Sequence, residues 1–221
     1  MTPPPLLVPL LPLVPLLSTL PDSSAARAAL DLIRANESAA TANHSVRTFL
    51  FAMLLAEYRG VTDFDASLLF FSCVLHDVGL SEMGNRTQRF EVDGADVATD
   101  FLAEQGFSAA DRGTVWEAIA LHTSAGIAER RGPVTELTRR GVGLDFGRDE
   151  GCVSDEQAAA IHAAYPRLGM AGSLVDEIVG QAQARSEKAP RYSMAAELLR
   201  ERESIGTTAL EQGAAQSRWG A

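Results

Sequence analysis

The feature that most constrains the fold is the recurrence of apolar residues at helical spacing. Within residues 44–59, positions 46, 49, 50, 53 and 54 are all apolar. Spacings of three and four residues place such side chains on one face of an α-helix. Aromatic residues make up only 6% of the chain, while alanine and leucine are plentiful, and this favours helices over sheets. No strand-like alternation extends beyond a few residues, so the sequence predicts a single all-α domain.

Capping residues and glycines set the expected limits of the helices. Asn43 is expected to cap a helix that ends at Gly60, and Ser108 to cap a helix that ends near Leu121. Residues 79–89 and the glycine-rich stretch GVGLDFGRDEG are expected to be loops. The remaining helices are expected over about 23–37, 65–76, 93–105, 133–141, 155–164, 173–184 and 194–203. The domain is expected over residues 20–205, followed by a flexible tail over residues 206–221.

Composition and charge narrow the function classes. The chain of 221 residues is 46% hydrophobic and 22% charged, with a formal net charge of −10. This is typical of a soluble globular protein, and it offers no basic patch of the kind that binds nucleic acid. Cys73 and Cys152 are not spaced as a metal-binding pair, and Cys73 lies in an apolar run. We therefore expect a cytoplasmic protein with reduced cysteines and a small-molecule substrate.

The first 19 residues form a separate segment, MTPPPLLVPLLPLVPLLST. It lacks the basic residues that precede the apolar run of a secretory signal. Pro9, Pro12 and Pro15 would break a membrane helix, and the run is shorter than the roughly twenty residues a bilayer requires. We expect an extended arm over the core or over a partner subunit. An apolar arm favours a homo-oligomer and no membrane association.

Two histidines and two aspartates lie where the expected helices begin or end. The apolar run LLFFSCVL ends in His76 and Asp77, His44 opens an earlier helix, and Asp145 follows a later one. A buried carboxylate is unfavourable unless it is paired or bound to a metal. Two imidazoles and two carboxylates make a plausible site for a divalent metal with room for water.

Five stretches together resemble one known family. They are NHSVRTFLFA, VLHDVGLSE, RFEVDGADVA, AIALHTSAGIAER and GVGLDFG. In this order they resemble the HD-domain superfamily of metal-dependent hydrolases, and more narrowly its cyanamide-hydratase-like branch, over about residues 20–184. The resemblance implies a helical bundle with metal ligands at His44, His76, Asp77 and Asp145.

The number of histidines bears on the number of metals. Members of the superfamily with two metals need extra histidines between the His-Asp pair and the last aspartate, and this chain has only His122 there. His162 lies beyond Asp145 and is expected to be a packing or surface residue. One metal is therefore expected. Zn²⁺ is the first choice because it keeps an open catalytic position, while Fe²⁺, Mn²⁺ and Ni²⁺ stay open.

His122 and Asp77 are the expected catalytic residues. His122, in LHTSAG, follows an amphipathic helix and is a candidate general acid or base; its alternative is a histidine favoured by the helix dipole. Asp77 is expected to order water as well as to bind metal. Asn43 and Thr123 are expected to orient substrate.

Three further charged residues are candidates for supporting roles, and two of them have an alternative interpretation. Glu91 and Asp93 in FEVDGAD can orient a metal-bound histidine, although Asp93 can equally cap the next helix. Arg47, one helical turn beyond His44, can stabilise an acidic ligand or bind an anionic substrate. Alternatively, Arg47 is a solvated residue on a helix face.

Three functions follow from this pattern. The first is a hydratase-type lyase, in which metal-activated water adds to a small nitrile such as cyanamide to give urea. The second is a phosphohydrolase of a nucleotide or another phosphomonoester, for which Arg47, Arg86 and Arg89 are the nearest cations. The third is a binding module with a vestigial metal site, which the complete set of ligand positions argues against.

Overall fold

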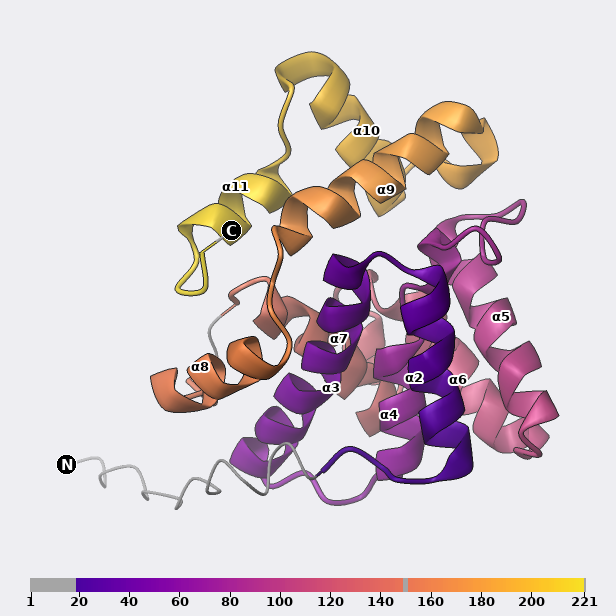
Figure 1. Cartoon of the computed structure of the whole chain (residues 1–221). Helices are drawn as coiled ribbons and strands as arrows, with labels where there is room; N and C mark the ends of the chain where they lie inside the picture. The colour runs from indigo at the N-terminus through magenta and orange to yellow at the C-terminus, as the bar shows by residue number, and fades with distance from the viewer. Residues whose placement is uncertain (1–18, 149–150, 221) are drawn as a thin grey trace.

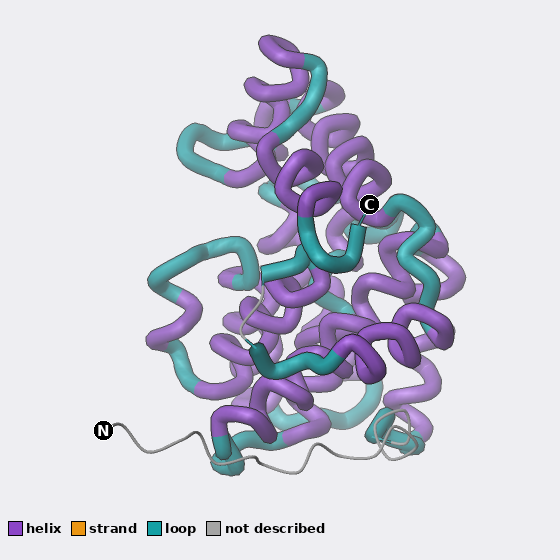
Figure 2. Tube along the Cα trace, turned by 90° about the vertical axis from the view of Figure 1, so that its left-hand side faces the viewer, coloured by secondary structure: helices purple, strands orange, loops and turns teal. Residues whose placement is uncertain are grey.

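The chain folds into helices alone over the residues that the computed structural model describes, 19–148 and 151–220 (Figure 1). This part contains ten α-helices, three short 3₁₀-helices and no strand (Figure 2), so the all-α prediction is confirmed. The elements are α2 (Ser24–Asn36), α3 (Ala39–Arg59), α4 (Ala66–Val74), η1 (Val78–Leu80), α5 (Phe90–Glu104), α6 (Ala109–Leu121), η2 (Ala128–Arg130), α7 (Pro133–Asp145), α8 (Asp155–Ala164), α9 (Met170–Ala184), η3 (Ser186–Lys188), α10 (Met194–Ile205) and α11 (Ala209–Gln216).

The helices form a main bundle and a smaller layer across one end of it. Helices α2, α5, α6 and α7 pack around α3 and α4, whose apolar side chains supply nearly half of the largest buried cluster. Figure 1 shows α9, α10 and α11 lying together beyond the end of this bundle. A second buried cluster joins α9 and α10 to Phe90 at the start of α5. This cluster attaches the smaller layer to the bundle.

Two glycines permit the close helix contacts that position the site. A Cβ atom on Gly141 of α7 would lie 2.5 Å from the Thr48 carbonyl oxygen of α3. A Cβ atom on Gly79 of η1 would lie 1.9 Å from the Phe90 carbonyl oxygen of α5. Real Cβ atoms do not approach backbone this closely, so only glycine fits at either point. The first contact brings α7 against α3, and the second brings η1 against α5.

Four helices begin or end three or more residues from the predicted limits; one of them, α9, begins at Met170 rather than Ser173. Helix α3 begins at Ala39 because the Ser38 side chain accepts a hydrogen bond from Thr41 N, so Asn43 is not a cap. Helix α5 begins at Phe90, which places Asp93 inside its first turn. Helix α7 continues through GVGLD to Asp145. Of the glycines in that stretch, Gly141 packs against α3 rather than forming a turn.

The segment expected to be a flexible tail is instead partly helical. Helix α11 has a reciprocal capping box between Thr208 and Glu211, which satisfies backbone donors at its start. Beyond it, Trp219 donates from Nε1 to the Leu144 carbonyl oxygen at 2.7 Å. The apolar contact of its ring with the core explains why this segment packs down.

The proline-rich arm lies outside the described residues, apart from Thr19. The expectation that it covers a partner subunit, and with it the homo-oligomer, stays a prediction. None of the described helices is long and apolar enough to cross a bilayer.

Candidate metal centre

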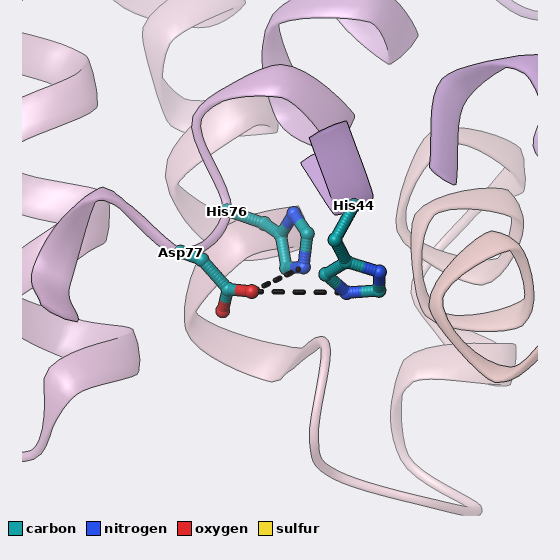
Figure 3. A group of neighbouring side chains, drawn as sticks. All are labelled: His44, His76 and Asp77. Carbon is teal, nitrogen blue, oxygen red and sulfur yellow. Dashed lines mark ion pairs between the residues drawn. The ribbon is translucent and has the colours of Figure 1, made fainter. Parts of the chain in front are cut away.

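His44, His76 and Asp77 meet at the end of the bundle, as Figure 3 shows. Oδ2 of Asp77 lies 3.0 Å from Nε2 of His76 and 3.7 Å from Nε2 of His44. One ligand atom from each residue lies within 4.8 Å of the others, and all three residues are buried. His44 comes from α3, whereas the other two follow α4 directly. The sequence prediction that these three residues converge is confirmed.

The opposite nitrogen of each imidazole is fixed by the protein. Nδ1 of His76 lies 2.7 Å from the Cys73 carbonyl oxygen, which can only accept, so this nitrogen carries the proton. Nδ1 of His44 lies 2.6 Å from Oδ2 of Asp145, a carboxylate that likewise accepts. Both Nε2 atoms therefore present a lone pair toward Asp77.

The Nε2 atoms of His44 and His76 are buried and have no hydrogen-bond partner among the described residues. Two lone pairs that face a carboxylate oxygen repel it unless a positive charge lies between them. A divalent metal with nitrogen and oxygen ligands fits this donor set. Without metal, a proton takes the place: burial lowers the pKa of His76, but the charge and hydrogen bond of Asp77, together with the Cys73 carbonyl and the charge of Asp145, raise it on balance.

Asp145 lies behind His44 and does not join this group. Nε and a terminal nitrogen of Arg47 donate to Oδ1 and Oδ2 of Asp145 at 2.8 and 2.7 Å, and Arg167 donates to Oδ1 at 3.2 Å. Burial alone would raise the pKa of Asp145, but Arg47 and the hydrogen bonds hold it well below its ordinary value. The expected fourth ligand is therefore a residue that orients a ligand. Arg47 is fully buried, so it is neither solvated nor available to substrate.

His122 approaches the group from the other side. Its Nε2 lies 3.7 Å from Oδ1 of Asp77, and its Nδ1 lies 2.7 Å from the Ile119 carbonyl oxygen. Its ring makes an edge contact with His76, with centroids 4.9 Å apart. Burial, followed by the charge of His76, lowers the pKa of His122 to about 4. His122 therefore lies beside His76 and Asp77, with Nε2 directed at Asp77; its role in proton transfer stays a prediction.

Glu91 and Thr123 form a buried cluster next to His122. Thr123 Oγ1 donates to Glu91 Oε1 at 2.7 Å, and Arg89 donates to Glu91 Oε2 at 3.0 Å and to Thr123 Oγ1 at 3.1 Å. Burial opposes ionisation of Glu91, but Arg89 lowers its pKa below the ordinary value. Glu91 makes no hydrogen bond to a ligand imidazole, because backbone or Asp145 already holds those nitrogens. Thr123 does line the cavity, as expected for a residue that orients substrate.

Asp93 and Asn43 lie away from the group. Asp93 pairs with the buried Lys188 at 2.5 Å and accepts from Gln88 N, so it ties η3 to the start of α5. Asn43 donates to the Pro166 carbonyl oxygen at 2.9 Å. Neither residue orients a ligand or faces the cavity. The structure therefore places neither of the two beside the grouped residues or in the cavity lining.

His162, the remaining histidine, is a packing residue as expected. Its ring makes edge contacts with Phe51 and Trp219, at centroid distances of 6.0 and 5.5 Å. Its Nε2 lies 3.9 Å from Oδ1 of Asp145. Cys73, expected in the core, is buried and forms no disulfide. Burial raises the pKa of its thiol to about 12.

The metal ligands line a cavity of about 610 Å³ between the two helix layers. Its floor is formed by His44, His76, Asp77 and His122. Its outer wall comes from α9, α10 and α11, which sequence reasoning had not connected with the site. Apolar residues of these helices recur at helical spacing, so the sequence showed that they bury a face but not which face they meet. The wall residues are Leu174, Ile178, Met194, Glu197, Leu198, Glu201, Ala209, Leu210, Gly213 and Ala214.

Comparison with protein families gives one match. The model of the HD domain matches residues 41–161. This range includes the three grouped ligands, His122 and Asp145, and it ends before α9. No curated protein matches the chain.

Proposed function

Because the chain belongs to the HD-domain family, whose members are typically metal-dependent hydrolases, we propose that it activates water with one metal ion held by His44, His76 and Asp77. The observation that carries this proposal is the pair of buried Nε2 atoms without partners beside the Asp77 carboxylate. Zn²⁺ is the ion we propose, since two imidazoles and one carboxylate are a hydrolytic zinc set. When bound, such an ion supplies Lewis acidity and makes water more acidic.

The protein's own groups have distinct tasks in this scheme. Asp145 and the Cys73 carbonyl orient the two ligand imidazoles, which keeps Nε2 directed at the ion. His122 moves a proton at Nε2, because its Nδ1 is already committed to Ile119. In hydration of a nitrile, this nitrogen takes a proton from the attacking water and returns it to the substrate nitrogen. The apolar walls exclude other water from the reaction.

We propose hydration of a nitrile, as in the cyanamide-hydratase-like branch, ahead of phosphate hydrolysis. Phosphoryl transfer needs cations that face the substrate. Arg47 is buried against Asp145, Arg86 pairs with the exposed Asp100, and Arg89 donates to Glu91. None of the three lines the cavity. The site therefore suits an uncharged electrophile such as a nitrile carbon.

A phosphomonoester is the second candidate, favoured by two other arginines. Arg139 and Arg148 do line the cavity. Arg139, however, donates to Glu129 and to the His122 carbonyl oxygen. Arg148 is the other lining arginine, and it forms no ion pair with any described residue. One exposed guanidinium is less than phosphate chemistry usually requires.

A substrate panel on zinc-loaded protein tests the proposal. The panel contains cyanamide, small alkyl nitriles and phosphomonoesters, with His76→Ala as the metal-site control. We expect ammonia-free hydration products from the nitriles and none from the control. Phosphate release without nitrile hydration would support the second candidate. Stoichiometric metal with no turnover of any substrate would favour a binding module.

A further inference from the structure

We infer that the substrate carries an uncharged apolar body beside its reactive group, and that α9, α10 and α11 form the surface that selects it. The inference rests on the proposed function, because it names the substrate class of the same cavity. It goes further by assigning specificity to a layer that the HD-domain match does not include. Three observations carry it: the size of the cavity, the chemistry of its wall and the state of its polar groups.

The cavity is too large for cyanamide. A water molecule occupies about 30 Å³ of liquid, and cyanamide, with three non-hydrogen atoms, takes up only a few times as much. The cavity of about 610 Å³ lies in the range that encloses a drug-sized organic ligand. A three-atom substrate would leave most of this volume to water. Such water would compete for any electrophile at the metal.

The wall opposite the metal ligands is largely apolar. Leu174 and Ile178 of α9 lie one helical turn apart, and Leu198 of α10 and Leu210 of α11 face the same space. Phe90 and Phe146 complete the apolar surface from the bundle side. Contact with an apolar body would remove this surface from water, which contributes to binding in proportion to its area.

Apart from Asp77, two of the four charged groups around the cavity form ion pairs within the protein, and a third accepts a backbone hydrogen bond. Glu197 pairs with Arg200, and Glu201 accepts from Ala209 N. Arg139 pairs with Glu129. A charged substrate body would have to displace one of these partners or lie at the exposed Arg148. An uncharged body needs neither, so neutrality is part of the inference.

Two glycines make a matched pair for the test. Gly213 of α11 lines the cavity, whereas Gly113 of α6 does not. Both lie in exposed stretches of helix, and a Cβ atom on either meets no heavy atom within 4 Å. A side chain at position 213 therefore begins without a clash at Cβ, and we expect the ring of Gly213→Phe to narrow the cavity. Gly113→Phe adds the same ring elsewhere, and both variants should melt no lower than the parent because glycine weakens helices.

The experiment measures equilibrium binding of straight-chain nitriles to the zinc-loaded full chain by ligand-observed NMR. The series runs from acetonitrile through butyronitrile to hexanenitrile, with cyanamide alongside. We expect Kd to fall by up to about fourfold per added methylene. Gly213→Phe should weaken hexanenitrile binding by roughly tenfold or more, equivalent to losing two or three buried methylenes, and leave cyanamide unchanged. Gly113→Phe should change neither.

The separate measurements distinguish a failure of this inference from a failure of the proposed function. A Kd that does not depend on chain length, or equal effects of the two glycine variants, would overturn the inference whatever the turnover. If 5-cyanopentanoate binds more tightly than hexanenitrile, and Arg148→Ala removes this preference, the inference that the substrate body is uncharged would be wrong. Chain-length-dependent binding without hydration of any nitrile would support the inference on the cavity and reject the nitrile chemistry.

Discussion

His44 and Asp145 are 101 residues apart in the chain, yet Nδ1 of one lies 2.6 Å from Oδ2 of the other. The contact follows from the close approach of α3 and α7 at Thr48 and Gly141. His44 lies one helical turn from Thr48 in α3, and Asp145 lies one helical turn from Gly141 in α7. A glycine in α7 thus permits the approach that sets Nδ1 of His44 against Asp145 and leaves Nε2 facing Asp77.

Asp145→Asn should loosen this ligand and destabilise the fold. The variant keeps the shape of the side chain but leaves Arg47 and Arg167 buried beside a neutral group. Removing one partner of a buried ion pair costs about 3–5 kcal/mol, and losing a group that orients a ligand weakens metal binding about 10- to 100-fold. Urea unfolding and zinc competition titrations measure the two effects. Unchanged zinc affinity in a folded variant would show that Asp145 does not orient His44.

His122→Ala should retain metal and fold but lose rate. Its Nε2 faces Asp77 without belonging to the group of three ligands, and removal of a general acid or base lowers kcat about 10²-fold or more. Metal content, melting temperature and turnover should be measured on one preparation. Loss of metal would make His122 a ligand. Unchanged turnover would assign proton transfer to water ordered by Asp77.

Trp219→Phe should weaken the end of α7. The variant keeps an aromatic ring against Phe51, with which Trp219 stacks at 6.0 Å, but removes the Nε1 donor to the Leu144 carbonyl. Loss of one such hydrogen bond costs about 1 kcal/mol. Because Leu144 precedes Asp145, zinc affinity should fall severalfold as well. If the variant loses the expected stability but keeps full zinc affinity, Trp219 contributes to packing alone and not to the position of Asp145.

Glu37→Gln should stabilise the metal-free protein increasingly as pH rises. Both carboxylate oxygens of Glu37 are buried without a hydrogen-bond partner among the described residues. Burial, and then the charges of Asp77 and Glu177, raise its pKa well above 4.5. The folded state therefore holds this proton more tightly than the unfolded chain, and stability falls as pH rises above about 4.5.

The glutamine variant lacks this titration, so its advantage over the parent should grow from pH 4.5 upward. Urea unfolding of both proteins in a chelator at pH 5 and pH 8 measures the difference. A constant difference between the two pH values would contradict the raised pKa.

The three grouped ligands could be predicted because their chemistry is local. His76 and Asp77 are adjacent at the end of an apolar run, and a third ligand needed only the order of the motifs. The role of Asp145 could not be predicted in the same way. GVGLD reads as a turn by its glycines, and only the contact with α3 shows that they allow helices to pack. Arg167 and the α9–α11 wall depend on contacts between distant segments, which neither spacing nor composition reveals.

The central claim is that His44, His76 and Asp77 hold one divalent metal. Its most direct test compares the zinc content per chain of the parent with that of His76→Ala. Both proteins are loaded with zinc, desalted and measured by mass spectrometry, and circular dichroism checks that each is folded. We predict one equivalent in the parent and little in the folded variant, because one of three protein ligands is lost. Full zinc in His76→Ala, or none in the loaded parent, would contradict the account.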